Sequence, residues 1–129
     1  MKKIAIILVA LVLLPVIIVM FSVFYHEVKL QAFSKQLKTA AQTHGVEEFL
    51  LESFVSADTG SGPFCSYTAK IEAPLRFERQ VRLVANSPFL PAEPSLYPKV
   101  DVTIQKGPEN VSVTIYDGGH RPLLDYRCL

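Results

Sequence analysis

The chain has 129 residues, with 13 Lys and Arg against 12 Asp and Glu, and it contains two cysteines. This balanced charge offers no electrostatic basis for binding nucleic acid, and it gives no long-range attraction for a strongly charged partner. About 100 residues remain beyond the apolar N-terminal stretch described next, which is enough for one small domain with a modest core.

Residues 4–25 form a stretch without a charged side chain, preceded by Lys2 and Lys3. A helix needs about 20 apolar residues to cross a bilayer, so this stretch predicts a transmembrane anchor. Pro15 is the one helix breaker, which membrane helices tolerate. A cleaved signal peptide is the alternative, but its apolar region is shorter, about 7–15 residues, and ends in a small-residue site that is missing here.

The flanking charges predict how the anchor is oriented. Lys2 and Lys3 precede the span, whereas the far side opens with His26 and Glu27. By the positive-inside rule, residues 1–3 are a cytoplasmic tip, residues 4–25 are the anchor, and residues 26–129 are an extracytoplasmic domain. The short Lys-Lys leader suggests a bacterium, hence the inner membrane with the domain in the periplasm. The expected partners are the lipid bilayer, through residues 4–25, and another envelope protein.

Apolar residues at spacings of three and four predict a juxtamembrane helix after the span, within residues 26–57. Gly45 follows the last periodic residue, so we predict a kink or break there. Beyond it the apolar phase changes, and Glu47 and Glu48 would lie in the first turn of a second helix, where the helix dipole favours them.

From residue 65 the apolar period becomes two, which is typical of strands. We predict a hairpin turn at residues 117–120 and about five strands, over residues 65–71, 75–83, 100–105, 111–115 and 124–128. Strands of this kind form an antiparallel sheet with one buried face, which the preceding helix would cover. The predicted fold class is therefore α+β.

Cys65 and Cys128 are predicted to form a disulfide, because two cysteines in an oxidising compartment usually pair. Cys65 begins the first predicted strand and Cys128 ends the fifth, so the two residues meet if those strands are antiparallel neighbours. Two buried free thiols are the alternative. No metal site is predicted, because two thiols without a nearby His or third Cys leave a zinc shell incomplete.

Four prolines within residues 86–98 predict a stiff exposed loop. Apolar side chains on a stiff loop suit contact with a partner, since little entropy is lost on binding. Alternatively, they fold back onto the sheet. The predicted partner-binding residues are Phe89, Leu90, Leu96 and Tyr97.

One stretch, Asp58-Thr59-Gly60-Ser61, resembles the active-site signature of aspartic proteases, which implies a dimer whose two carboxylates share a proton. The resemblance ends there: Asp58 follows a predicted helix instead of a strand, and the later family motif is absent. His26, His44 and His120 lack the spacing of a metal motif, and no nucleophile elbow or phosphate loop occurs. We predict no catalytic residue, no cofactor and no enzymatic activity.

The expected role is therefore to bind, sense or scaffold an envelope component. Two alternatives remain. A long N-terminal helix on a disulfide-stapled sheet resembles a type IV pilin in outline, although no Gly precedes the apolar run and no Glu lies in its first turn. A periplasmic immunity protein that blocks a toxin would present an acidic or apolar patch.

Overall fold

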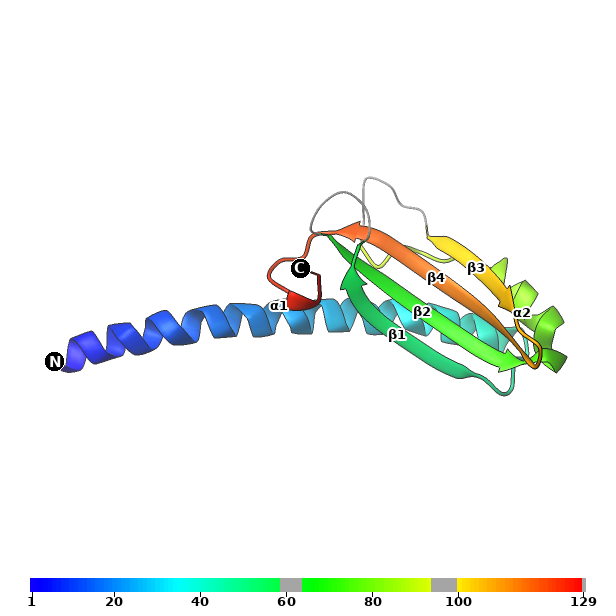
Figure 1. Cartoon of the computed structure of the whole chain (residues 1–129), viewed down its shortest axis with the longest axis horizontal. Coiled ribbons are helices and arrows are strands. Elements are labelled where there is room, and N and C mark those ends of the chain that lie inside the picture. The colour runs from blue at the N-terminus through cyan, green and yellow to red at the C-terminus, as the bar shows by residue number, and fades with distance from the viewer. Residues whose placement is uncertain (59–63, 94–99, 129) are drawn as a thin grey trace.

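The computed structural model describes residues 1–58, 64–93 and 100–128. In chain order the elements are α1 (Lys2–Thr43), β1 (Leu50–Ala57), β2 (Cys65–Pro74), the 3₁₀ turn η1 (Leu75–Phe77), α2 (Glu78–Ala85), β3 (Asp101–Lys106), β4 (Asn110–His120) and the 3₁₀ turn η2 (Tyr126–Cys128). Helix α1 runs the length of the molecule, and its N-terminal half projects beyond the sheet (Figure 1). The fold is α+β, with a helix packed on an antiparallel sheet.

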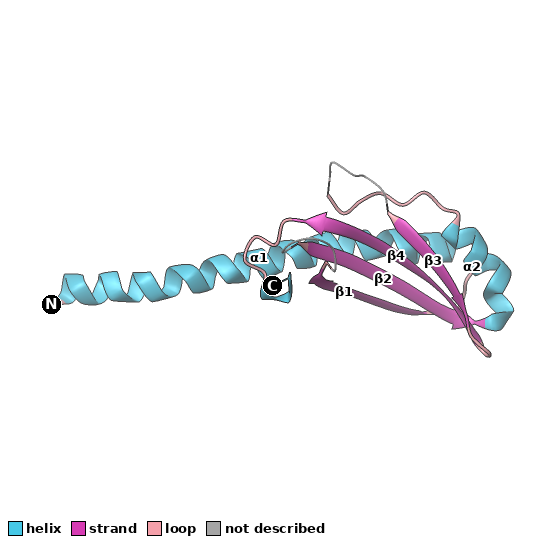
Figure 2. Ribbon diagram, turned by 45° about the horizontal axis from the view of Figure 1, so that its top comes forward, coloured by secondary structure: helices cyan, strands magenta, loops and turns pink. Residues whose placement is uncertain are grey.

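The four strands lie in the order β1-β2-β4-β3, and every neighbouring pair is antiparallel. Their register sets the faces: Ile71 of β2 lies between Leu51 of β1 and Val113 of β4, and Val113 pairs with Ile104 of β3. Helix α1 covers the face that carries this apolar row, and the opposite face is open (Figure 2). The predicted sheet with one helix-covered face is therefore confirmed.

The second half of α1 supplies the apolar stripe that the sequence predicts. Leu30, Phe33, Leu37 and Ala41 are all buried, one helical turn apart. They pack in one core with buried side chains of the central strands, among them Tyr67, Ile71, Val113 and Ile115. The N-terminal half of α1 is unburied over its most apolar part, and it is long and apolar enough to cross a membrane or to act as a signal sequence.

Helix α1 ends as predicted, two residues before Gly45. The Gly45 amide donates to the Gln42 carbonyl (3.2 Å) and the Val46 amide to the Ala41 carbonyl (2.9 Å). This pair of bonds is a Schellman motif, which requires a left-handed residue at its corner, and Gly45 has φ +77°. Buried Val46 completes the motif with an apolar contact.

The predicted second helix after Gly45 is wrong, because residues 50–57 form strand β1. Leu50 and Phe54 stand four residues apart, which mimics a helical face. In the fold they point away from α1, while the alternate residues Leu51 and Val55 face it. Pairing of all eight residues with β2 outweighs the weak local helical preference.

The predicted second strand, residues 75–83, is also wrong. Pro74 ends β2, and the chain continues as η1 and α2. Val81 and Val84 are buried at a spacing of three, and Arg82 pairs with Glu78 one turn earlier at 2.8 Å. Arg79, which interrupts the alternation, fits a helical period instead.

The predicted hairpin at residues 117–120 and the fifth strand are wrong as well. Strand β4 continues to His120, and residues 121–128 form an irregular segment that ends in η2. The sheet thus has four strands in the described residues. The Cys65–Cys128 disulfide is present, but it joins the start of β2 to η2, not to a strand.

Candidate protein-binding surface

The four residues that the sequence predicts to contact a partner differ in their exposure. Phe89 is half-buried and packs against the core, so it folds back onto the domain. Leu90 is 70% exposed. Leu96 and Tyr97 lie outside the described residues. Of the four predicted contact residues, Leu90 is therefore the one that the structure shows presented to solvent.

The backbone of Leu90 is held on both sides by one side chain of α1. The Leu90 amide donates to Oε1 of Gln36 at 2.8 Å, and Nε2 of Gln36 donates to the Leu90 carbonyl at 3.0 Å. This amide-to-backbone clamp imitates a strand partner and fixes Leu90 while leaving its side chain outward. Sequence reasoning missed Gln36, because a polar residue on a helix surface carries no signal of a contact 54 positions away.

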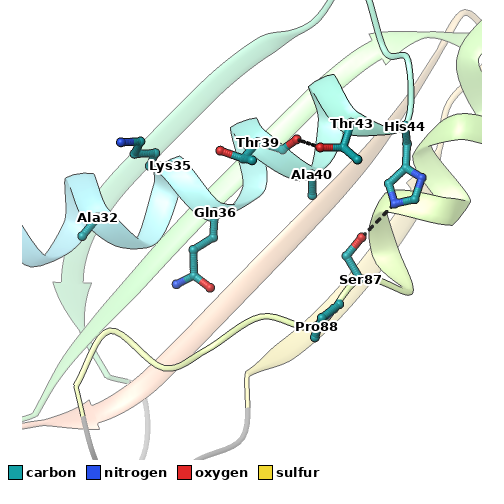
Figure 3. A pocket seen from close by; sticks show the side chains of 9 residues that line it. All are labelled: Ala32, Lys35, Gln36, Thr39, Ala40, Thr43, His44, Ser87 and Pro88. Carbon is teal, nitrogen blue, oxygen red and sulfur yellow. Dashed lines mark hydrogen bonds between the residues drawn. The ribbon is translucent and has the colours of Figure 1, made fainter.

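An open groove of about 550 Å³ lies beside the clamp, between α1 and the segment after α2 (Figure 3). The hydrogen bond between Nε2 of His44 and Oγ of Ser87, at 3.1 Å, bridges its two walls. Small and polar side chains line it, with Lys35 as the charged member: Ala32, Lys35, Gln36, Thr39, Ala40, Thr43, His44, Ser87 and Pro88. The lining therefore offers hydrogen-bonding groups and one lysine ammonium without a concentration of charge.

A cluster of buried polar side chains lies where α1 leaves the sheet. His26 contacts the Tyr67 hydroxyl through Nδ1 (2.6 Å) and the Pro122 carbonyl through Nε2 (3.2 Å). Burial lowers the pKa of His26, so the ring is neutral near pH 7. Through these two contacts His26 joins α1, β2 and the C-terminal segment. It is fully buried, so a substrate cannot reach it.

His120 forms the other half of this cluster. Its Nε2 lies 2.7 Å from Oδ2 of Asp117, and its Nδ1 lies 3.2 Å from Oε2 of Glu93. Burial lowers the pKa of His120, but the two carboxylates outweigh it and the net shift is upward. Asp117 also accepts the Ala92 amide at 2.7 Å, so the cluster holds residues 92 and 93, shortly after the Leu90 clamp.

The position of Asp58 differs from the prediction that weighed against the protease resemblance. It follows strand β1, not a helix, as an aspartic-protease carboxylate would. Its carboxylate, however, accepts the Tyr116 hydroxyl and the Gly119 amide, both at 2.8 Å. Gly118 leaves room for it, since a Cβ there would lie 2.7 Å from Oδ2. These bonds give Asp58 a role in tying the end of β1 to β4.

Among the described residues, no group of three or more His, Cys, Asp or Glu side chains is arranged to hold a metal ion. Comparison with protein-family models, curated proteins and solved structures finds no match for this chain.

Proposed function

We propose that this protein is a membrane-anchored module of the bacterial envelope whose periplasmic domain binds another envelope protein. The observation that carries the proposal is the Gln36 clamp, which presents exposed Leu90 beside the groove on α1. Burying a leucine side chain stabilises a complex by about 1.5–3 kcal/mol. Since the clamp already orders the backbone, little of that gain is lost to ordering on binding.

The location rests on two features, the apolar N-terminal half of α1 and the disulfide. The apolar half of α1 has the length and composition of a membrane anchor, with Lys2 and Lys3 on the side expected to stay in the cytoplasm. The Cys65–Cys128 disulfide suits an oxidising compartment. Together they support a single-pass inner-membrane protein with its domain in the periplasm.

Site-specific photocrosslinking in intact cells tests the binding surface. A crosslinker at position 90 of the full chain should yield a discrete adduct with one envelope protein, and Leu90→Asp should weaken capture of that protein about 10- to 100-fold. Gln36→Ala should weaken it less, by loosening the loop. Leu50 provides a matched control, because it is 71% exposed and lies on the sheet face away from α1.

A crosslinker at position 50 should give no adduct with that protein, and Leu50→Asp should leave its capture unchanged. Equal adducts from both positions, or unaltered capture by Leu90→Asp, would refute the proposed surface. If the captured protein is a toxin, the module acts as an immunity protein.

A filament subunit is the second candidate, favoured by the unbroken course of α1 from Lys2 to Thr43 and by its exposed apolar half. In a filament those apolar halves would pack against each other. Amino-terminal sequencing of the mature protein distinguishes the two: a leader trimmed directly before the apolar run supports the filament, and an intact Met1 or Lys2 end supports the anchor.

A further inference from the structure

The C-terminal segment, residues 121–128, is fixed against α1 at the level where the apolar run ends. Nη2 of Arg127 donates to the Val23 carbonyl at 3.3 Å, and Nη1 lies 3.1 Å from Oε2 of Glu27. One turn away, the Pro122 carbonyl accepts from His26. Three contacts therefore hold this segment beside residues 23–27.

The charges in these contacts set the depth of α1 in a bilayer. Asp125 is fully buried and pairs with Nη2 of Arg127 at 2.7 Å, so this charged pair lies level with Val23 and belongs outside the hydrocarbon. Residues 4–21 then make up the hydrocarbon span, about 27 Å at 1.5 Å per residue, close to the roughly 30 Å thickness of a bilayer core. Residues 22–27 and the C-terminal segment lie at headgroup depth.

The C-terminal segment exposes apolar side chains at that depth. Leu123 is 48% exposed, Leu124 52% and Tyr126 67%. Leu123 has φ +54°, the one positive value at a non-glycine residue in the described part of the chain. A leucine in the left-handed region is less stable by about 1–2 kcal/mol. The local backbone conformation by itself therefore opposes the exposure of Leu123 beside Leu124.

We propose that residues 121–126 form a second membrane contact, in which Leu123, Leu124 and Tyr126 enter the headgroup–acyl boundary of the outer leaflet. Lipid is the occupant because Arg127 of this segment contacts Val23 and Glu27, at the end of the apolar run where Phe21 and Phe24 are also exposed. Tyrosine is favoured at this boundary, and the exposed Arg121 is placed to meet lipid phosphate.

This contact would hold the domain upright on the bilayer instead of letting it swing on a single helix. The groove residues on α1, within 32–43, would then stand roughly 16–33 Å above the hydrocarbon surface, from the rise of a helix. The inference rests on the anchor in the proposed function and is independent of partner binding.

The chain contains no tryptophan, so one introduced residue reports without background. We would reconstitute full-length Leu124→Trp in phosphatidylcholine–phosphatidylglycerol vesicles whose acyl chains carry bromine near the headgroup. The expected result is emission shifted to shorter wavelength and loss of most of the fluorescence. Leu50→Trp, at the far end of the domain, should keep its fluorescence and emit as in water.

A Phe21→Trp variant separates two failures. If Phe21→Trp is quenched and Leu124→Trp is not, the second contact is wrong while the anchor stands. If Phe21→Trp also escapes quenching, α1 does not span, and both the anchor and this inference fall. Quenching of Leu50→Trp equal to that of Leu124→Trp would overturn the upright placement. Tyr126→Trp repeats the test in case Leu124→Trp fails to form the disulfide.

Discussion

Nδ1 of His26 and the hydroxyl of Tyr67 lie 2.6 Å apart with both side chains fully buried. The bond has a definite direction, because Nε2 faces the Pro122 carbonyl, which can only accept. Nε2 therefore carries the proton and Nδ1 accepts from Tyr67, whose pKa burial raises. The first residue after the apolar run is thus tied to β2, one of the two central strands of the sheet.

Replacing Tyr67 with Phe should leave the buried Nδ1 without a donor. A buried acceptor that loses its partner costs about 1–3 kcal/mol of stability. Urea denaturation of the full chain in detergent measures the loss. Tyr126→Phe is the control, since Tyr126 is largely exposed and should change little. Equal effects of the two substitutions would contradict the assignment.

The two buried histidines should give stability opposite dependences on pH. His26 has a lowered folded pKa, so its contribution is present above the unfolded value of about 6.5 and declines as pH falls below it. His120 has a raised folded pKa, so its contribution is present below about 6.5 and is lost as pH rises through the folded value.

Denaturation between about pH 5.5 and 8 separates these contributions. The His120→Gln variant retains His26, which lies near Asp125 and Arg127, and its stability should decrease as the pH falls. The His26→Gln variant retains His120, which lies between Asp117 and Glu93, and its stability should decrease as the pH rises. The slope with pH is the readout, so a uniform loss does not obscure it. Slopes of the same sign in both variants would rule out this assignment.

Removing the disulfide should destabilise the domain strongly. Cys65 and Cys128 are 63 positions apart. Closing a loop of that size lowers the conformational entropy of the unfolded chain, which stabilises the folded state by about 4 kcal/mol. Cys65→Ala combined with Cys128→Ala should therefore lower the urea midpoint markedly, and reductant should do the same to the native chain. A midpoint insensitive to reductant would show that the thiols are unpaired.

Gly45→Ala should weaken the end of α1 through backbone strain alone. Nothing lies within 4 Å of a Cβ at this position, but φ is +77°. An L-residue there costs about 1–2 kcal/mol, and asparagine tolerates the conformation better than alanine. The expected order of stability is native, then Gly45→Asn, then Gly45→Ala. An alanine variant as stable as the native chain would show that α1 can end without the left-handed residue.

Elements with a long or unambiguous local pattern could be read from the sequence. The apolar run, the stripe from Leu30 to Ala41 and the stop at Gly45 each depend on neighbouring residues along one helix. Strands β2 and β3 and the first half of β4 alternate cleanly, so their period was visible too. The candidate site was only partly visible: Leu90 could be proposed from its proline-rich setting, but its clamp could not.

The sequence by itself determined the N-terminal apolar run that is long enough to cross a membrane, the α+β class and the pairing of two cysteines, because length, period and cysteine count are properties of the chain. Tertiary structure decided which short amphipathic segments became strands. Residues 50–57 and 75–83 carry patterns that fit either form, and long-range pairing with β2 or burial of Val81 and Val84 chose between them. Tertiary structure also brought Gln36 into contact with Leu90 and His26 into contact with Tyr67, because contacts between distant positions exist only once the chain has folded.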